Sequence, residues 1–238
     1  DTLGYLTWAE SPSWGVKPTD IIGARNFLSE WRELVMRDRN HPSIVAWTPL
    51  NETRQIKENP EQHFRFHRDV YDVTRALDPT RPVNETSGYI HVKTDLFTVH
   101  TYEQDPDKLR EQLAPSPQKG VFRCYPDWEA EYKGQPYLVD EFGGILWIPE
   151  DRKPFLPTSW GYGEAPKTED EFFERLEGQV ETVLSFDHIC GYCYTQLTDV
   201  EQEQNGIYNY DRSTKFDMKK IKRIFNKKPD RKSTRLNS

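Results

Sequence analysis

The sequence predicts an α/β fold, an incomplete (β/α)8 TIM barrel that holds strands 3 to 8 and lacks the first two. Short apolar runs alternate strictly with longer amphipathic runs, the pattern of β/α units around a parallel sheet. The chain has 238 residues and its first Met is Met36, whereas a complete barrel takes about 250 residues. A doubly wound sheet is the competing fold, but no glycine-rich phosphate turn follows the first strand.

Each predicted element rests on a local pattern. Strands are expected at residues 4–10, 43–51, 81–86, 96–102, 137–142 and 190–198. Helices are expected at residues 24–37, 61–77, 169–186 and 218–225, because apolar side chains recur there at helical spacing. Thr168 is the expected N-cap of the third helix. Residues 112–135 and 144–166 are rich in Pro, Gly and aromatic residues and are expected to be loops.

Charge and hydropathy exclude two classes of partner. The net charge is −7, but residues 219–238 hold nine Lys or Arg and one Asp, which leaves −15 for residues 1–218. A body this acidic is a poor polyanion binder, so no nucleic-acid partner is expected. No run approaches the 18 consecutive apolar residues of a spanning helix, so no membrane partner is expected either.

The chain divides into a body and a tail. Residues 1–226 are expected to form the partial catalytic barrel, and residues 227–238 a disordered basic tail. Residues 230–238 read DRKSTRLNS, which resembles the translation of a sequencing adapter. We therefore assign no function to the tail and expect any targeting signal to lie outside this sequence.

No metal site or other cofactor is expected. Cys190 and Cys193 form a C-x-x-C, but no second pair completes four ligands, and the segment is predicted to be a buried strand. His63 and His67 lie four residues apart without the Glu of a zinc-binding H-E-x-x-H, so an exposed helix face is expected.

Polar and carboxylate side chains end several predicted strands, where barrels place their functional residues. These ends are Glu10, Asn51 with Glu52, Asn84 with Glu85, His100 with Tyr102, Asp140 with Glu141, and Gln196. Glycoside cleavage needs two facing carboxylates, one that donates a proton and one that attacks the anomeric carbon. Glu52 and Glu141 are the best pair, although a salt bridge or cap would explain either residue taken alone. Glu85 repeats the Asn-Glu pair and is expected to be a decoy.

Two motifs resemble glycoside hydrolase family 2, the group of β-galactosidases, β-glucuronidases and β-mannosidases. Residues 37–52, RDRNHPSIVAWTPLNE, resemble the acid/base motif, and residues 136–144, PYLVDEFGG, resemble the nucleophile strand. Residues 4–10 are similar to the third barrel strand, and residues 191–206 to the eighth strand and its loop. The resemblance covers residues 1 to about 226 in order.

The resemblance implies a role for each matching residue. Glu52 becomes the general acid/base and Glu141 the nucleophile of a retaining hydrolase. Asn51 would contact the 2-hydroxyl of the sugar, and Tyr102 would orient the nucleophile. The weaker matches, which are as consistent with a supporting role or a wall of the sugar site as with direct contact, are Glu10, His100, Trp160 and Tyr194.

Departures from the family pattern shape the predicted substrate. The first two barrel strands and the N-terminal sugar-binding and sandwich domains are missing from this chain. The Asn-x-Lys signature of β-glucuronidases is absent from the loop after the eighth strand, where residues 209–212 read NYDR, and Asp211 in this loop would repel a uronate. The prediction is a retaining exo-β-glycosidase acting on terminal β-D-galactosides or related neutral β-hexosides. The alternatives are a β-glucuronidase, an endo-β-glycanase of the same clan, or a non-catalytic carbohydrate-binding barrel.

Overall fold

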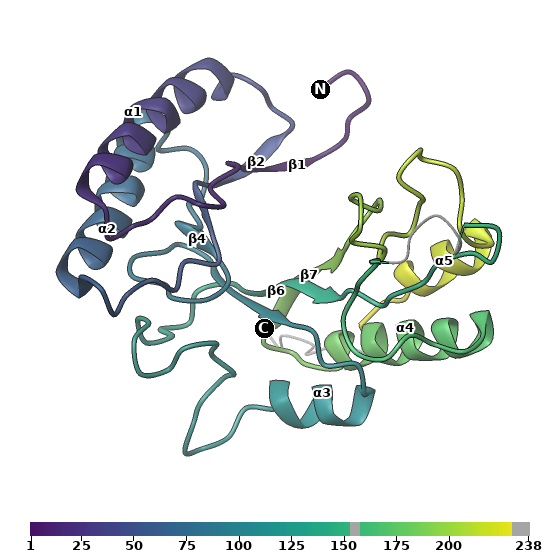
Figure 1. Cartoon of the computed structure of the whole chain (residues 1–238). Helices are drawn as coiled ribbons and strands as arrows, with labels where there is room; N and C mark the ends of the chain where they lie inside the picture. The colour runs from purple at the N-terminus through teal and green to yellow at the C-terminus, as the bar shows by residue number, and fades with distance from the viewer. Residues whose placement is uncertain (153–157, 230–238) are drawn as a thin grey trace, which may run out of the picture. The chain divides into compact units, whose positions relative to one another are not determined.

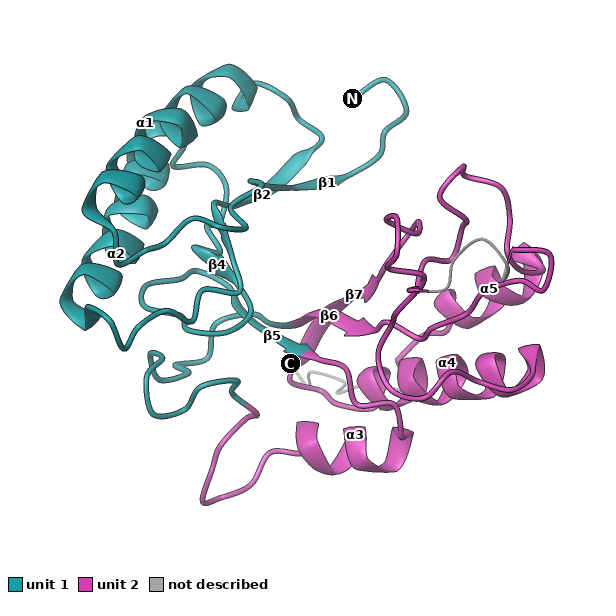
Figure 2. Cartoon of the chain, in the orientation of Figure 1, with its two compact units in different colours: residues 1–100, 123–138 teal, residues 101–122, 139–238 magenta. Residues whose placement is uncertain are grey.

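A computed structural model describes residues 1–152 and 158–229. The chain divides into two compact units, shown in Figure 2: unit 1 comprises residues 1–100 and 123–138, and unit 2 comprises residues 101–122 and 139–238. Most of the predicted tail, residues 230–238, lies outside the described residues. Within the described part of the chain, no helix combines the length and the apolar character needed to cross a bilayer.

Unit 1 contains two parallel strand pairs and two long helices (Figure 1). β1 (Thr7–Glu10) pairs with β2 (Ile44–Thr48), and α1 (Ile21–Asp38) connects them. β3 (Leu50–Asn51) pairs with β4 (Thr86–Ser87), and α2 (Pro60–Leu77) connects them. The alternation of strand and helix between parallel partners is the pattern that the sequence predicts for a β/α barrel.

Aromatic side chains form the core of unit 1. Trp31 of α1 meets Trp47 of β2 edge to face, with ring centroids 5.9 Å apart, and Phe27 meets Phe66 of α2 in the same way at 5.8 Å. The two indole N–H groups are satisfied: Trp31 donates to Thr74 Oγ1 and Trp47 donates to Asp78 Oδ2, both at 2.8 Å. These bonds remove the penalty that a buried, unpaired indole N–H would impose.

Unit 2 contains α3 (Pro106–Leu113), α4 (Glu169–Leu184), β7 (Ile189–Thr195) and α5 (Met218–Phe225). β5 (Phe97–Thr101) and β6 (Tyr137–Gly143) both begin in unit 1 and end in unit 2, and the strand order of the sheet is β5-β6-β7. Phe172 of α4 stacks on Phe216 with centroids 4.3 Å apart. Thr168 Oγ1 accepts from the Glu171 N–H at 3.1 Å, so the predicted N-cap is confirmed.

Several element predictions need correction. The strand predicted at 43–51 is two strands, because Pro49 has no N–H and interrupts the ladder. The strand predicted at 81–86 is reduced to β4 and a single bridge between Trp47 and Val83. α3 was not predicted; its N-cap is Asp105, whose side chain accepts from two backbone N–H groups.

Two burial predictions are wrong. His63 and His67 lie on the buried face of α2 with no exposed surface, and their rings stack with centroids 4.1 Å apart. Cys190 and Cys193 were expected inside a buried strand, but both are exposed on β7.

Candidate active site

Glu52 stands directly after β3, where backbone contacts fix its position. The Asn51 N–H donates to Ser13 Oγ at 2.9 Å, and the Glu52 N–H donates to the Ser87 carbonyl at 3.0 Å. Glu52 has a φ of 50°, in the left-handed region that is uncommon for residues with a β-carbon. A residue in this strained conformation persists only where the surrounding structure holds it, and such residues are found preferentially at functional sites.

His100 of β5 holds the Glu52 side chain. Its Nδ1 lies 2.8 Å from Glu52 Oε1, and its Nε2 lies 3.0 Å from Ser87 Oγ. The His100 side chain is 1% exposed and that of Glu52 is 14% exposed. One oxygen of the carboxylate is therefore fixed by a buried imidazole, while the residue keeps some access to solvent.

A cavity of about 210 Å³ opens beside Glu52 within unit 1. Its lining includes Asn51 and Glu52, the exposed Trp14, and Arg54. Arg54 also lies over the ring of Tyr89, 5.9 Å from its centroid. Burial, followed by the negative charge of Glu52, raises the pKa of Tyr89 well above its usual value, so Tyr89 stays a neutral phenol near the carboxylate.

Glu141 lies on β6 in unit 2, and Tyr102 is its hydrogen-bond donor. The Tyr102 hydroxyl donates to Glu141 Oε2 and lies 3.4 Å from Thr195 Oγ1 on β7. Burial, followed by the Glu141 carboxylate, raises the pKa of Tyr102 far above that of a free phenol. Tyr102 therefore stays protonated, and its hydroxyl remains available to donate to Glu141.

The turn after Glu141 requires glycine. Gly143 and Gly144 have φ of 86° and 61°, where a side chain is strained. A Cβ on Gly143 would lie 2.2 Å from the Tyr194 ring, and one on Gly144 would lie 2.4 Å from the Tyr162 ring. The two glycines thus allow aromatic rings to pack directly on the backbone of the predicted nucleophile strand.

A chain of aromatic rings leads from Trp160 to Tyr102. Tyr162 stacks on Tyr102 with centroids 3.5 Å apart and planes 3° from parallel, and Trp160 meets Tyr162 edge to face at 5.9 Å. Trp160 is 46% exposed, so its ring can contact a ligand. Tyr194 packs edge to face on Phe142, with centroids 5.7 Å apart, and so contacts β6 at the residue that follows Glu141.

The predicted site residues thus fall into two groups. Unit 1 brings Asn51, Glu52 and His100 together, and unit 2 brings together Tyr102, Glu141, Tyr194 and, through Tyr162, Trp160. Glu10 ends β1, opposite Thr48, and is exposed. The sequence did not single out Ser87, Tyr89 or Tyr162, although Tyr162 lies in the same SWGYG segment as Trp160.

Glu85 has a structural role, as its prediction as a decoy anticipated. Its side chain is fully buried; Oε2 lies 3.1 Å from His91 Nδ1, and Oε1 accepts from the N–H groups of Val92 and Lys93. These bonds satisfy both oxygens and tie the turn after β4 to the body of unit 1.

Comparison with known proteins identifies the family. Residues 8–144 match the model of the TIM barrel domain of glycosyl hydrolases family 2, which is more than half of the chain. The chain belongs to glycosyl hydrolases family 2. The resemblance seen in the two Glu motifs is therefore confirmed, and the TIM-barrel class with it, while the assignment of strands 3 to 8 stays a prediction.

Relatives in the family carry two activity names. The beta-glucuronidase of Canis lupus familiaris is 35% identical over 168 residues, 68% of this chain and 22% of that protein. A beta-galactosidase of Thermoanaerobacterium thermosulfurigenes is 28% identical over 158 residues, 60% of this chain and 19% of that protein.

Solved structures show the same fold. The structure of a beta-glucuronidase from an uncultured Clostridium sp. superposes with a TM-score of 0.67 at 17% identity, covering 93% of this chain and 40% of that one. The family 2 chain spans about a fifth of the length of the two curated relatives.

Proposed function

We propose that the protein containing this chain is a retaining exo-β-glycosidase in which Glu52 is the acid/base and Glu141 the nucleophile. The observation that supports it best is that each carboxylate, one directly after β3 and one in the last half of β6, has a hydrogen-bond partner suited to its role. His100 holds one oxygen of Glu52, and the protonated Tyr102 donates to Glu141. Membership of glycosyl hydrolases family 2 supports the same chemistry.

The reaction proceeds in two displacements. The Glu141 carboxylate attacks the anomeric carbon while the Glu52 carboxylic acid gives its proton to the glycosidic oxygen, so the aglycone leaves as an alcohol. Glu52, now ionised, takes a proton from water, and the resulting hydroxide attacks the glycosyl ester and releases Glu141. Both steps invert the anomeric carbon, so the β configuration is retained. The mechanism requires the two carboxyl groups to stand about 5–5.5 Å apart.

Asn51 and the aromatic residues fit the recognition of a sugar. Asn51 lies beside Glu52 at the same cavity and would hydrogen-bond the 2-hydroxyl. The Trp160 ring, 46% exposed, offers a flat apolar surface to the hydrophobic face of a pyranose. We favour a neutral β-hexoside as the substrate, and a galactoside first. Asp211 follows β7, and its negative charge would repel the carboxylate of a uronate.

A β-glucuronide is the second candidate, and one contact favours it. Arg152 lies 2.9 Å from Asp211 Oδ2, so the charge that would repel a uronate is compensated. The names of the relatives also include beta-glucuronidase. If Asp211 disfavours uronates, Asp211→Asn should raise the ratio of glucuronide to galactoside hydrolysis. Glu201→Gln, which changes another exposed acidic residue between β7 and α5, should leave the ratio unchanged.

Azide rescue tests the two assignments together. Glu141→Ala and Glu52→Ala should each lose most activity on aryl β-glycosides. Azide should restore Glu141→Ala with an α-glycosyl azide and Glu52→Ala with a β-glycosyl azide, because azide replaces the nucleophile in one and the water in the other. Normal activity in either variant would contradict the proposal.

Cleavage of polysaccharides alone would favour an endo-β-glycanase, and ligand binding without any hydrolysis would favour a non-catalytic barrel.

A further inference from the structure

The side-chain amide of Gln104 joins the two backbone segments that carry Tyr102 and Glu141. Its Nε2 donates one N–H to the Tyr102 carbonyl at 3.0 Å and the other to the Gly143 carbonyl at 2.6 Å. Tyr102 is the donor to the Glu141 carboxylate, and Gly143 lies two residues after Glu141. A single amide group therefore fixes the spacing between the nucleophile strand and the segment that orients the nucleophile.

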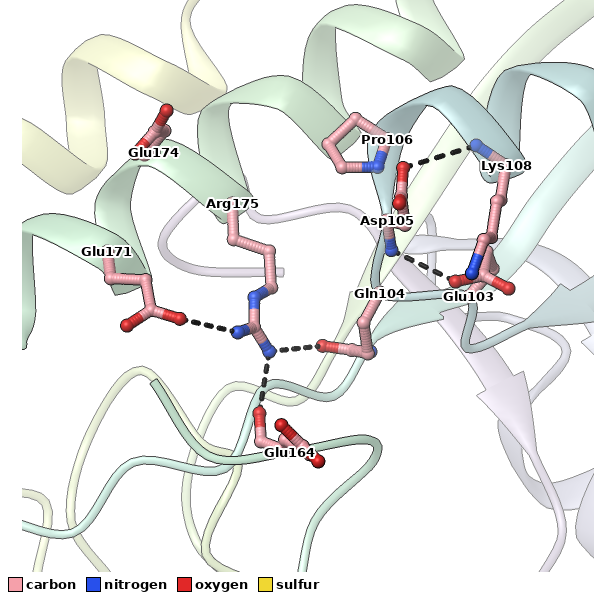
Figure 3. A pocket seen from close by; sticks show the side chains of 9 residues that line it. All are labelled: Glu103, Gln104, Asp105, Pro106, Lys108, Glu164, Glu171, Glu174 and Arg175. Carbon is pink, nitrogen blue, oxygen red and sulfur yellow. Dashed lines mark hydrogen bonds and ion pairs between the residues drawn. The ribbon is translucent and has the colours of Figure 1, made fainter. Parts of the chain in front are cut away.

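Arg175 of α4 fixes which way this amide points. Its guanidinium lies 3.4 Å from Gln104 Oε1 and 2.7 Å from the Glu164 carbonyl, and it pairs with Glu171 Oε1 at 3.1 Å, as Figure 3 shows. Arg can only donate and backbone carbonyls can only accept. The oxygen of the Gln104 amide must therefore face Arg175, and its NH2 group must face the two carbonyls.

The aliphatic part of Gln104 is also confined. Gly163 has a φ of 66°, and a Cβ at that position would lie 2.4 Å from Gln104 Cγ. Gly163 thus permits a close approach of backbone to the Gln104 side chain. The Gln104 side chain is thus held at its amide oxygen, its amide nitrogen and its aliphatic carbons. A side chain fixed in this way can keep the Tyr102 and Gly143 backbone segments at a constant distance from each other.

We propose that Gln104, oriented by Arg175, is a positioning residue for the Tyr102–Glu141 pair in the glycosyl-transfer step; this rests on the proposed function. The bridge holds the phenol of Tyr102 against the attacking carboxylate. When it is lost, both segments gain freedom and the carboxylate is misaligned with the anomeric carbon, although neither catalytic side chain has changed.

Four variants test the bridge. Gln104→Glu keeps the acceptor that faces Arg175 but places an oxygen against the two carbonyls, and Gln104→Met keeps the length without any hydrogen bond. Gln104→Asn keeps the amide on a side chain that is one methylene shorter. This variant still tests the bridge if Gln104→Glu and Gln104→Met fold poorly. Arg175→Lys keeps the charge but loses the planar fork. Glu174→Gln is the control, because Glu174 lines the pocket drawn in Figure 3 together with Gln104 and Arg175 and, in the described part of the chain, has no hydrogen bond to either residue.

The kinetic result should identify the step. The Gln104 variants should lose kcat/KM by about 10- to 100-fold, since small displacements of an attacking group carry losses of that order. The factor should be equal for 2,4-dinitrophenyl and phenyl β-glycosides, because the acid/base side is untouched. Inactivation by a 2-deoxy-2-fluoro glycosyl fluoride should slow by the same factor. Arg175→Lys should show a smaller loss, and Glu174→Gln should stay within twofold of wild type.

Mass spectrometry separates failure of this inference from failure of the proposed function. Absence of a fluoro-sugar label on Glu141 in the wild-type protein would overturn the proposed function. Hydrogen exchange still tests the bridge in that case: peptides covering residues 101–104 and 139–147 should exchange faster in Gln104→Met than in Glu174→Gln. Unchanged exchange in folded variants, or an unchanged labelling rate, would overturn the role of Gln104.

Discussion

His100 touches Glu52 through one defined atom: Nδ1 lies 2.8 Å from Oε1, while Nε2 is turned to Ser87. The two ring nitrogens therefore have separate partners, and side-chain amides can imitate them one at a time. The amide nitrogen of Asn occupies a position near Nδ1, and that of Gln occupies a position near Nε2.

This division predicts opposite behaviour for two similar substitutions. His100→Asn should keep the contact to Glu52 and most of the activity, whereas His100→Gln should keep only the contact to Ser87. General acid catalysis contributes about 10²- to 10⁴-fold, so His100→Gln should lose about 10- to 100-fold on phenyl β-glycosides. The loss should nearly vanish on 2,4-dinitrophenyl β-glycosides, which leave without protonation. Equal losses on both substrates would contradict a role through Glu52.

Glu129 should make the protein less stable as the pH rises through the range from 4.5 to 6. Burial raises its pKa from 4.5 to about 6, and its Oε2 is buried without a hydrogen-bond partner among the described residues. Because the folded state binds the proton more tightly than the unfolded state, stability present below pH 4.5 is lost by pH 6, by about 2 kcal/mol.

Urea denaturation at a series of pH values measures this loss. In Glu129→Gln, the free energy of unfolding should lack that decline, since no proton is lost in either state. Glu131→Gln, which changes an exposed residue two positions along the chain, should follow the wild-type curve. Parallel curves for wild type and Glu129→Gln would show that Glu129 does not titrate in this way.

His63 should make the protein less stable as the pH falls, which is the opposite of the effect of Glu129. Burial lowers its pKa from 6.5 to about 4, and both ring nitrogens are buried with no hydrogen-bond partner in the part of the chain that the structure describes. The unfolded state is protonated first as the pH falls, so stability present above pH 6.5 is lost by pH 4, by about 3 kcal/mol.

His63→Met tests this by removing the titrating ring. The variant should unfold with a flatter pH dependence between 6.5 and 4. At pH 8 it should be at least as stable as wild type, because it replaces a buried polar ring without partners by an apolar side chain. A steeper acid loss in the variant would contradict the prediction.

The contrast between Glu52 and His63 shows what the sequence could predict. Glu52 and Glu141 each lie in a run of specific residues, so motif and strand-end position predict them as the site carboxylates from the sequence alone. The burial of His63 and His67 was predictable too, since with Phe66 and Val70 they occupy positions i, i+3, i+4 and i+7 of one helical face. The polar residue type of the two histidines led to the prediction of an exposed face, whereas their helical spacing with Phe66 and Val70 indicates a buried one.

Gln104 illustrates the limit of such prediction. The two partners of its amide nitrogen are backbone carbonyls, and Gly143 lies 39 residues away in sequence. Backbone acceptors leave no residue-type signal, so only the folded chain shows this bridge. The division of the strand predicted at 43–51 shows the same limit. The position of Pro49 is visible in the sequence, but the sequence does not show that β2 pairs with β1 while β3 pairs with β4.

Lys215 and Asp199 form a buried ion pair in unit 2. Lys215 Nζ lies 2.5 Å from Asp199 Oδ1 and 2.9 Å from the Trp147 carbonyl, and both side chains are almost fully buried. Burial raises the pKa of Asp199 and lowers that of Lys215, so each charge depends on the other for its stability. Removing one partner should leave the other charge uncompensated.

A double-mutant cycle should reveal this dependence. Lys215→Met should lower the free energy of unfolding by about 3–5 kcal/mol, because it leaves the Asp199 carboxylate buried and unpaired. Asp199→Asn together with Lys215→Met should cost less than the two single changes added together, since no buried charge remains. Lys219→Met, on the exposed face of α5, should stay within about 0.5 kcal/mol of wild type. Additive losses in urea denaturation would mean that the two charges do not stabilise each other, and Lys215 would then act only through its hydrogen bonds to the Trp147 carbonyl at 2.9 Å and the Gln204 carbonyl at 3.3 Å.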